Sequence, residues 1–345
     1  MTRRKILLSF FIGYALALPV ALLAADLSAK PPKPGATTTP KIQSLKILLS
    51  DDDGLTANVK ALQQALLAAG HQVVISVPCQ NQSGKGAAAN FLTPIGPLTK
   101  DCRGDSAKVG APGVGRIAAL NNAFYVDGTP VMATLYGIDI ASKQVWGTLP
   151  DLVISGPNEG QNLGSIVISS GTVSNAQMAL SRGLPAIAVS ADINTIDNAV
   201  LAREVADLTV KLVATLQAKN NGTRILPKDF ALNVNYPKFE AGHSQQLKWR
   251  ATRFGNFDWG SIRFVEDLSA DPTAAAFGLR DVHAPGITIS VKNKTDTTPE
   301  TDRDSEALQS LNGFVTVTPM ESGYEISPAG QQLFDNSVGR ALEEI

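Results

Sequence analysis

The sequence predicts an α/β protein in which helices cover both faces of a parallel sheet, followed by a smaller β-rich extension. Between residues 46 and 237, short apolar runs rich in β-branched residues alternate with stretches of helical spacing. Strands that alternate with helices form parallel sheets, and strands buried on both faces are apolar throughout. Beyond residue 237 the pattern changes to short β-like pieces separated by polar loops.

The predicted core elements follow one another regularly along the chain. Residues 46–50, KILLS, are a short apolar run typical of a buried parallel strand. In residues 55–69 the apolar positions have helical spacing, which predicts a helix that ends at Gly70. Further strands are predicted at residues 72–77, 124–126, 151–155, 185–190 and 230–235. Further helices are predicted near residues 130–141, 172–182 and 198–217.

Residues 238–345 are predicted to form the β-rich extension, which ends in a helical segment. Its strand-like pieces are residues 247–253, 286–291 and 313–318. Within the core, residues 78–115 form a long stretch rich in Gly, Ser and Pro without periodicity. Segments of this length are usually functional or mobile.

The N-terminal residues have the pattern of a secretory signal peptide. Arg3, Arg4 and Lys5 precede a mostly apolar, uncharged run at residues 6–25. The pattern predicts that residues 1–25 are removed and that the mature protein is periplasmic or secreted, without stable membrane association. The alternative is that the segment is not cleaved and anchors the protein in the membrane. Residues 26–45 are predicted to be a flexible leader, because the stretch that follows the signal is rich in Pro, Lys and Thr.

The composition excludes several classes of protein. With 30 Lys and Arg against 31 Asp and Glu, the chain lacks the basic excess of a general nucleic-acid binder. A Ser-His-Asp triad would have to use His71, His243 or His283, and no G-x-S-x-G or H-E-x-x-H motif occurs. Cys79 and Cys102 form no Cys-x-x-Cys motif, so they are either a disulfide or two buried thiols.

Polar clusters follow three of the predicted strands. The first strand leads into residues 51–54 (DDDG), the second into residues 81–84 (NQSG), and a later one into residues 156–164 (GPNEGQNLG). Open α/β sheets bind ligands at the carboxyl ends of their strands, which lie at one edge. The three loops are therefore expected to meet at one site.

Three consecutive carboxylates, Asp51 to Asp53, indicate a cation site. Adjacent carboxylates repel one another, so a cation is needed to ionise them together. Carboxylate, hydroxyl and amide oxygens suit magnesium, manganese or calcium rather than zinc. The alternative is an Asp-rich turn that caps a helix.

The loop at residues 156–164 and the predicted helix near residue 172 add features of an anion site. Asn158 and Asn162 lie among glycines, which permit close backbone approach, and their amides supply neutral oxygens or NH donors. Residues 170–172 (SGT) open the helix and would present NH groups to a phosphate, unless they only cap it. A divalent cation beside an anion site is an arrangement for phosphate-ester hydrolysis.

These motifs resemble the SurE family, the survival-protein 5′/3′-nucleotidases. The matching segments occur in the family's order: ILLSDDDG (47–54), VPCQNQSG (77–84), DLVISGPNEGQNLG (151–164), SSGTVSNAQMALSRGLPAIAVS (169–190), FALNVNYP (230–237) and FVTVTP (314–319). The resemblance implies a Rossmann-like, three-layer α/β/α core and an extension that assembles homodimers or homotetramers. It also implies hydrolysis of nucleoside 5′- or 3′-monophosphates with one divalent cation per subunit.

The resemblance also implies roles for individual residues. Those that would hold the metal are Asp52, Asp53, Ser83 and Asn158. Those that would line the phosphate pocket are Asn162, Ser170, Gly171 and Thr172. Asp52 and Asp53 are the expected catalytic residues, and either a water molecule or an Asp is the nucleophile.

The chain departs from the family's usual pattern at several points. Asp51 replaces the usual Asn, and Val131-Met132-Ala133 replaces the usual Thr-Asp-Cys. The added carboxylate either tightens metal binding or repels the substrate phosphate. Two alternatives to a nucleotidase remain at this point: a phosphatase for sugar phosphates or short polyphosphate, and a non-catalytic periplasmic protein that binds nucleotides or phosphate.

Overall fold

The computed structural model describes residues 43–220, 225–227, 229–255, 260–291, 302–324 and 327–335. The predicted signal peptide and all but the last three residues of the predicted leader lie outside this part of the chain. Among the helices of the described residues, none has both the length and the apolar character needed to cross a membrane.

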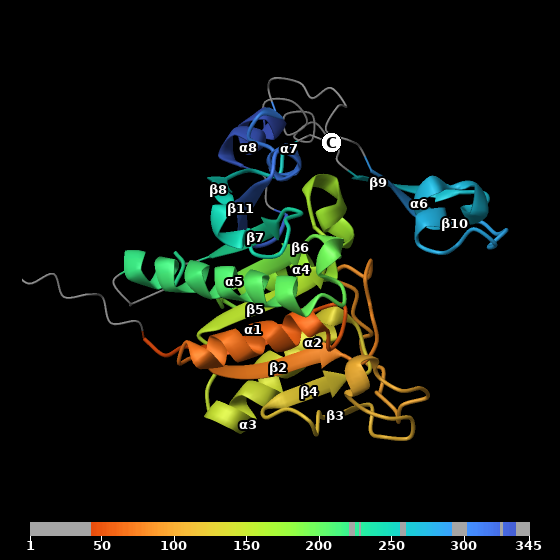
Figure 1. Ribbon diagram of the computed structural model, residues 1–345. Coiled ribbons are helices and arrows are strands. Elements are labelled where there is room, and N and C mark those ends of the chain that lie inside the picture. Colours follow the sequence, from red (N-terminus) through yellow and green to blue (C-terminus); the bar gives the residue numbers. More distant parts are fainter. Residues whose placement is uncertain are drawn as a thin grey trace, which may run out of the picture. The chain divides into compact units, whose positions relative to one another are not determined.

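A nine-stranded sheet forms the centre of the described structure (Figure 1). Six neighbouring strands pair in parallel, in the order β4 (Ala123–Val126), β2 (Gln72–Pro78), β1 (Lys46–Ser50), β5 (Leu152–Glu159), β6 (Ala186–Ala191) and β7 (Phe230–Tyr236). At one edge, β3 (Val114–Arg116) pairs antiparallel with β4. At the other edge, β11 (Phe314–Glu321) pairs antiparallel with β7 and parallel with β8 (Lys248–Ala251).

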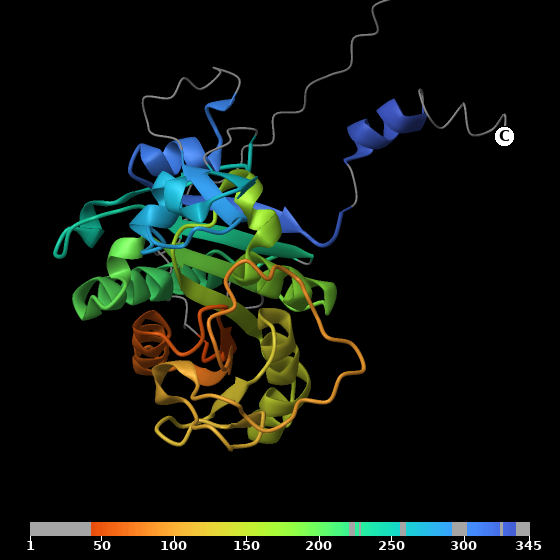
Figure 2. The same cartoon turned by 90° about the vertical axis from the view of Figure 1, so that its right-hand side faces the viewer.

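Helices cover both faces of the sheet, which confirms the predicted α/β fold (Figure 1 and Figure 2). On one face α1 (Ala57–Ala68) and α5 (Ala199–Lys219) lie side by side. The opposite face carries a helical run and one further helix: α2 (Pro130–Tyr136), the π-helical turn η2 (Gly137–Ala141), α3 (Ser142–Trp146) and α4 (Gly171–Ser181). The predicted helices at residues 55–69, 172–182 and 198–217 are each present within two residues.

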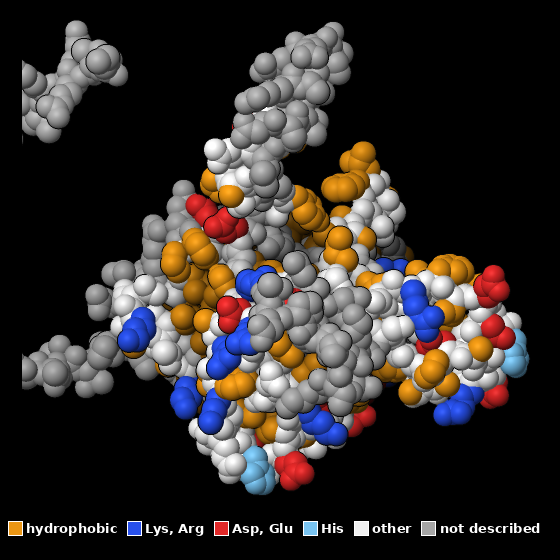
Figure 3. Space-filling model, turned by 90° about the horizontal axis from the view of Figure 1, so that it is seen from above, with side chains coloured by type: hydrophobic (Ala, Val, Ile, Leu, Met, Phe, Trp, Pro, Cys, Tyr) orange, Lys and Arg blue, Asp and Glu red, His pale blue; other side chains and the backbone are white. Residues whose placement is uncertain are grey.

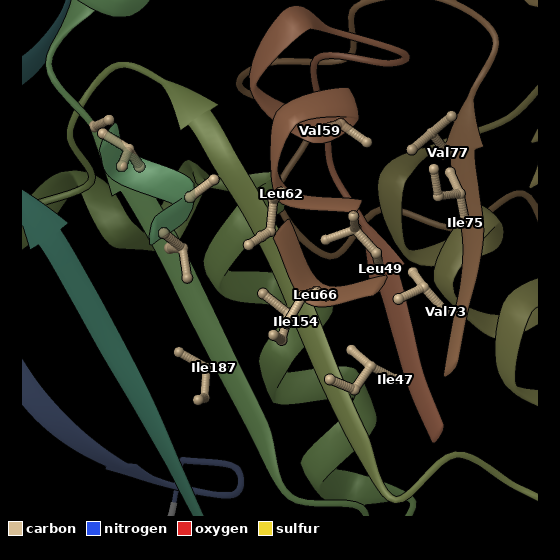
Figure 4. Close-up of a cluster of buried hydrophobic side chains, with 14 of the residues drawn as sticks. Ile47, Leu49, Val59, Leu62, Leu66, Val73, Ile75, Val77, Ile154 and Ile187 are labelled. Atoms are coloured by element: carbon tan, nitrogen blue, oxygen red, sulfur yellow. The ribbon is translucent and has the colours of Figure 1, made fainter. Parts of the chain in front are cut away.

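The alternation of side chains along β1 produces two separate hydrophobic clusters. Ile47 and Leu49 pack on the side of α1, and Leu48 packs on the opposite side of the sheet. Figure 4 shows Leu62 and Leu66 of α1 directed toward the strands that carry Ile47, Leu49 and Ile154. Both leucines are completely buried, and each stabilises the fold by about 2–3 kcal/mol.

The sheet continues beyond residue 237, where sequence analysis placed the start of the extension. Strand β11 pairs with β7 along its whole length, from Thr316 opposite Asn235 to Glu321 opposite Phe230. The part of the extension that stays outside this sheet is a hairpin of β9 (Gly260–Val265) and β10 (Gly286–Val291). We call residues 260–291 the hairpin unit; it also contains α6 (Pro272–Ala276).

Two strands were not predicted, and the last helices are short. Strand β3 has only three residues, and β9 has five exposed or half-exposed residues in a row, so neither has a strong apolar pattern. Helix α8 (Pro328–Phe334) lies where the helical segment at the end of the extension was predicted, whereas α7 (Glu306–Leu311) precedes β11.

Cys79 and Cys102 form a disulfide, which decides between the two alternatives that the sequence left open. Cys79 lies directly after β2, and the bond closes the first part of the long 78–115 segment. The backbone NH of Arg103 donates to the carbonyl of Cys79 at 2.8 Å. The disulfide therefore holds Arg103 against the end of β2.

Candidate metal centre

The three aspartates predicted as a cation site lie together at the carboxyl end of β1. Asp51, Asp52 and Asp53 are 0%, 3% and 2% exposed. One carboxylate oxygen from each lies within 4.8 Å of the others. The chain can turn away from the strand at Gly54, whose φ of +86° suits glycine. A side chain there would also lie only 3.2 Å from the carbonyl of Pro78.

Asp53 is oriented by donors from two other strand exits. Its Oδ1 accepts hydrogen bonds from Asn81 Nδ2 at 2.6 Å and from Ser83 Oγ at 2.8 Å. Its Oδ2 accepts from the backbone NH of Glu159 at 2.9 Å. The loops after β1, β2 and β5 therefore meet at this carboxylate, as the sequence predicted.

Asp52 is oriented by the first residues of α4. Its Oδ1 accepts from Thr172 Oγ1 at 2.7 Å, and the backbone of Gly171 supplies a second hydrogen bond. A Cβ on Gly171 would lie 2.6 Å from Asp52 Cβ, so only glycine permits this approach. Ser170 caps α4 by accepting from the backbone NH of Val173 at 3.1 Å.

The electrostatics of the cluster favour a bound cation. Burial, reinforced by the neighbouring charge of Asp53, raises the pKa of Asp52 to about 7. Burial and the charges of Asp53 and Asp52 also raise the pKa of Asp51 well above its usual value. Each shift reflects the cost of placing several negative charges in one buried site, and a divalent cation would remove that cost.

Unpartnered oxygens in the same region fit a metal. The amide of Asn158 donates from Nδ2 to the carbonyl of Gly160 at 2.8 Å, which leaves Oδ1 as its free acceptor. Asn158 Oδ1 and Asp51 Oδ2 are buried and have no hydrogen-bond partner among the described residues. Buried oxygens without donors are costly, whereas a hard cation binds such oxygens directly.

Arg103 and Glu159 are two charged residues of the site that sequence analysis missed. Arg103 donates to Glu159 Oε2 at 2.6 Å and to the backbone carbonyl of Asp53 at 2.8 Å. Glu159 follows Asn158 directly, so the motif itself pointed to it. Arg103 had no local signal, because its contact with the site depends on the fold of the 78–115 segment.

A cleft of about 580 Å³ opens over this cluster. It brings together five of the residues predicted for the site: Asp52, Ser83, Asn158, Asn162 and Ser170. Asp53, Gly171 and Thr172 do not line the cleft but contact residues that do. The fold therefore places the predicted site residues next to one another, and their roles in binding metal and phosphate stay predictions.

Asn162 joins the cleft to a buried network under the sheet edge. Its Nδ2 donates to Ser190 Oγ at 2.8 Å, and its carbonyl accepts from Asn233 Nδ2 at 2.9 Å. Asn233 also donates to Glu306, a completely buried residue of α7 that accepts from the backbone NH of Gly164. Burial raises the pKa of Glu306 to about 7. No local pattern in the sequence pointed to Glu306.

Comparison with known proteins identifies relatives of this chain by sequence and by fold. The family model described as survival protein SurE matches residues 47–261. The chain belongs to the SurE family. The crystal structure of the SurE protein from Aquifex aeolicus superposes with a TM-score of 0.59 and 26% identity, and covers 84% of this chain and 98% of that one.

Relatives named 5′-nucleotidase SurE and acid phosphatase are similar to part of this chain. A 5′-nucleotidase SurE from Pseudoalteromonas atlantica is 35% identical over 205 residues, which are 59% of this chain and 70% of that protein. A 5′-nucleotidase SurE from Geotalea daltonii is 39% identical over 194 residues, 56% of this chain and 66% of the relative. An acid phosphatase from Yarrowia lipolytica is 33% identical over 202 residues; the chain spans 56% of its length.

Proposed function

We propose that this protein is a divalent-metal-dependent phosphomonoesterase that hydrolyses nucleoside 5′- and 3′-monophosphates to a nucleoside and phosphate. One observation carries the proposal: the loops that follow three strands converge on a buried trio of carboxylates, and one of the three, Asp52, lines an open cleft. Relatives named 5′-nucleotidase and acid phosphatase support the same class of reaction.

Four side chains would hold one divalent cation: Asp52, Asp53, Ser83 and Asn158. The cation would neutralise the carboxylates and polarise a phosphoryl oxygen. Magnesium, manganese and calcium all suit this set of oxygen ligands. Because Ser83 donates its proton to Asp53, its lone pairs remain available toward the cleft.

The protein's own groups would then position the phosphate. Ser170 and Asn162 line the cleft at the start of α4, where the helix dipole favours an anion. Thr172 and Gly171 keep Asp52 in one orientation, and Arg103 limits the negative charge by pairing with Glu159. Substrate binding would therefore require little rearrangement of the carboxylates.

The decisive experiment measures phosphate release from AMP by the purified protein, before and after treatment with EDTA. We expect turnover that EDTA abolishes and that added magnesium or manganese restores. Asn158→Ala should weaken activation by the metal, and Asn90→Ala, at an exposed position outside the cleft, is the matched control. Undiminished turnover after metal removal would refute the mechanism, and nucleotide binding without turnover would identify a non-catalytic binding protein instead.

We also propose that the mature protein is periplasmic or secreted and self-associates as a dimer or tetramer. The signal-like pattern of residues 1–25 and the Cys79–Cys102 disulfide support export. Exposed apolar side chains on the hairpin unit, Phe264 and Ile262 among them, support self-association. Fractionation of expressing cells and light scattering of the purified protein test the two statements separately.

A further inference from the structure

A short part of the long segment that follows β2 is fixed against the end of that strand. Cys102 is bonded to Cys79, and the backbone NH of Arg103 donates to the carbonyl of Cys79 at 2.8 Å. Gln80, the residue after Cys79, donates from Nε2 to the backbone carbonyl of Asp101 at 2.6 Å. The backbone on both sides of Cys102 is therefore tied to the residues that follow β2.

The same short part packs on the backbone that follows β1. At Gly104 the φ of +65° suits glycine, and a Cβ there would collide with the carbonyl oxygen of Leu55. A Cβ on Gly54 would in turn lie 3.6 Å from Arg103 Cβ. The side chain of Arg103 therefore begins directly beside the loop that carries the aspartates.

The guanidinium of Arg103 joins two of the loops that meet at the metal centre. It donates from Nη1 to the backbone carbonyl of Asp53 at 2.8 Å and from Nη2 to Glu159 Oε2 at 2.6 Å. The backbone NH of Glu159 donates to Asp53 Oδ2 at 2.9 Å, which closes a ring of hydrogen bonds through the three residues. Because Glu159 follows Asn158 directly, this ring sets the position of the Asn158 amide relative to the Asp53 carboxylate.

Arg103 acts on the metal centre from behind the cleft. Asn158 and Glu159 line the cleft, whereas Arg103 does not. Among the described residues, the ion pairs that reach the metal centre both use this arginine, at 2.6 Å to Glu159 and 4.0 Å to Asp53. The planar fork of donors in a guanidinium can hold a carbonyl and a carboxylate at the same time, which the single ammonium of a lysine does not reproduce.

We propose that Arg103 is a positioning residue for the metal centre and that the Cys79–Cys102 disulfide holds it in place. The ring of hydrogen bonds fixes the spacing of the Asp53 carboxylate and the Asn158 amide before a cation binds, and this raises the affinity for the cation. Groups that orient metal ligands contribute about tenfold or more to metal affinity. The affinity therefore depends on a disulfide that lies outside the metal centre. This inference rests on the metal site of the proposed function and identifies a part of the chain that tunes it.

The test measures the dissociation constant of Mn²⁺ by electron paramagnetic resonance of the free ion, and kcat for AMP at saturating Mn²⁺, both well below the melting temperature. Arg103→Gln should raise the dissociation constant about tenfold, and saturating Mn²⁺ should restore most of kcat. Arg103→Lys keeps the charge without the fork and should raise the dissociation constant about as much. Replacing Cys79 and Cys102 by Ser should raise it by a smaller factor, because the hydrogen bonds of Arg103 can still form.

Two control variants should leave the dissociation constant of Mn²⁺ unchanged. Arg182→Gln removes an exposed arginine outside the cleft that also holds a carboxylate, that of Asp139, through two hydrogen bonds. Phe264→Ala changes the hairpin unit, which forms the lobe with apolar side chains at the right of Figure 3, and Phe264 does not line the cleft. The first control accounts for the loss of an arginine–carboxylate pair and the second for effects of self-association.

An unchanged dissociation constant in Arg103→Gln, with or without a lower melting temperature, would overturn the inference. If Arg103→Lys binds Mn²⁺ like wild type, charge alone is sufficient and the positioning role is wrong. If the variant without the disulfide keeps wild-type affinity, the part of the inference that concerns the disulfide is wrong. The Arg103 variants keep the disulfide, so they decide the question even where its loss prevents folding. Wild-type protein that binds Mn²⁺ but releases no phosphate from AMP would refute the proposed function alone, whereas protein that binds no divalent cation would refute both.

Discussion

A methyl group added at Gly171 would enter space that Asp52 and Pro130 already occupy. A Cβ there would lie 2.6 Å from Asp52 Cβ, 2.7 Å from Pro130 Cγ and 2.8 Å from Asp52 Oδ2, whereas ordinary contacts begin near 3.4 Å. The proline ring is rigid, and Asp52 is held by Thr172 at 2.7 Å. Gly171→Ala therefore forces Asp52 or the start of α4 to move.

Two effects of opposite sign determine the stability of this variant. Replacing Gly by Ala within a helix stabilises a protein by about 0.5–1 kcal/mol, but Gly171 is the first residue of α4, where this gain is smaller. Overpacking a buried site costs about 1–3 kcal/mol. The steric cost should win, with a net loss of about 1 kcal/mol or more. Displacement of a catalytic group by about 1 Å lowers the rate on the order of 10²-fold.

Thermal unfolding and the rate of AMP hydrolysis measure the two consequences. Gly96→Ala is the matched control, because Gly96 is exposed and a Cβ there would meet nothing within 4 Å. We expect Gly96→Ala to behave as wild type and Gly171→Ala to lose both stability and activity. A Gly171→Ala protein that melts and turns over like the control would show that Asp52 is not confined by α4.

Three further predictions test other parts of the molecule. Without metal, the raised pKa of Asp52, about 7, makes the folded state hold a proton that the unfolded chain releases. The melting temperature of wild type should therefore fall relative to Asp52→Asn as pH rises from about 4 to about 7, and magnesium should abolish this trend; a relative rise would contradict it. Replacing Cys79 and Cys102 by Ser opens a loop with a sequence separation of 23. It should lower the free energy of unfolding, measured in urea, by about 3 kcal/mol; an unchanged urea midpoint would contradict this prediction. Glu306→Ala leaves buried donors unpaired and should lower the free energy of unfolding in urea by about 3 kcal/mol. Glu321→Ala, at an exposed side chain, should leave this free energy almost unchanged.

Local patterns were sufficient to predict much of the core. The run KILLS became β1 with the predicted bounds, because an apolar run that short and uniform fits a strand buried on both faces. The polar exits after β1, β2 and β5 converge as expected, since parallel strands end at the same edge. These predictions needed only neighbours along the chain and the general geometry of parallel sheets.

Contacts between distant segments were not predictable in this way. The boundary after residue 237 separated β7 from β11, yet the two strands pair in the sheet. Glu306 contacts Gly164 and Asn233 across separations of 142 and 73 residues. A buried glutamate has no distinctive local pattern, and the alternation of side chains along β11 predicts a strand without identifying the strands that it pairs with.

The sequence by itself determined the alternation of strands and helices, the family to which the chain belongs, and the oxygen-rich loops that would hold a cation, because each depends on residues close together in the chain. Only the tertiary structure decided that Cys79 bonds to Cys102, that Arg103 pairs with Glu159, and that the hairpin unit lays Phe277 along the cleft. The physical reason is that these contacts depend on the direction in which each long connection leaves the sheet. That direction follows from the packing of the whole chain.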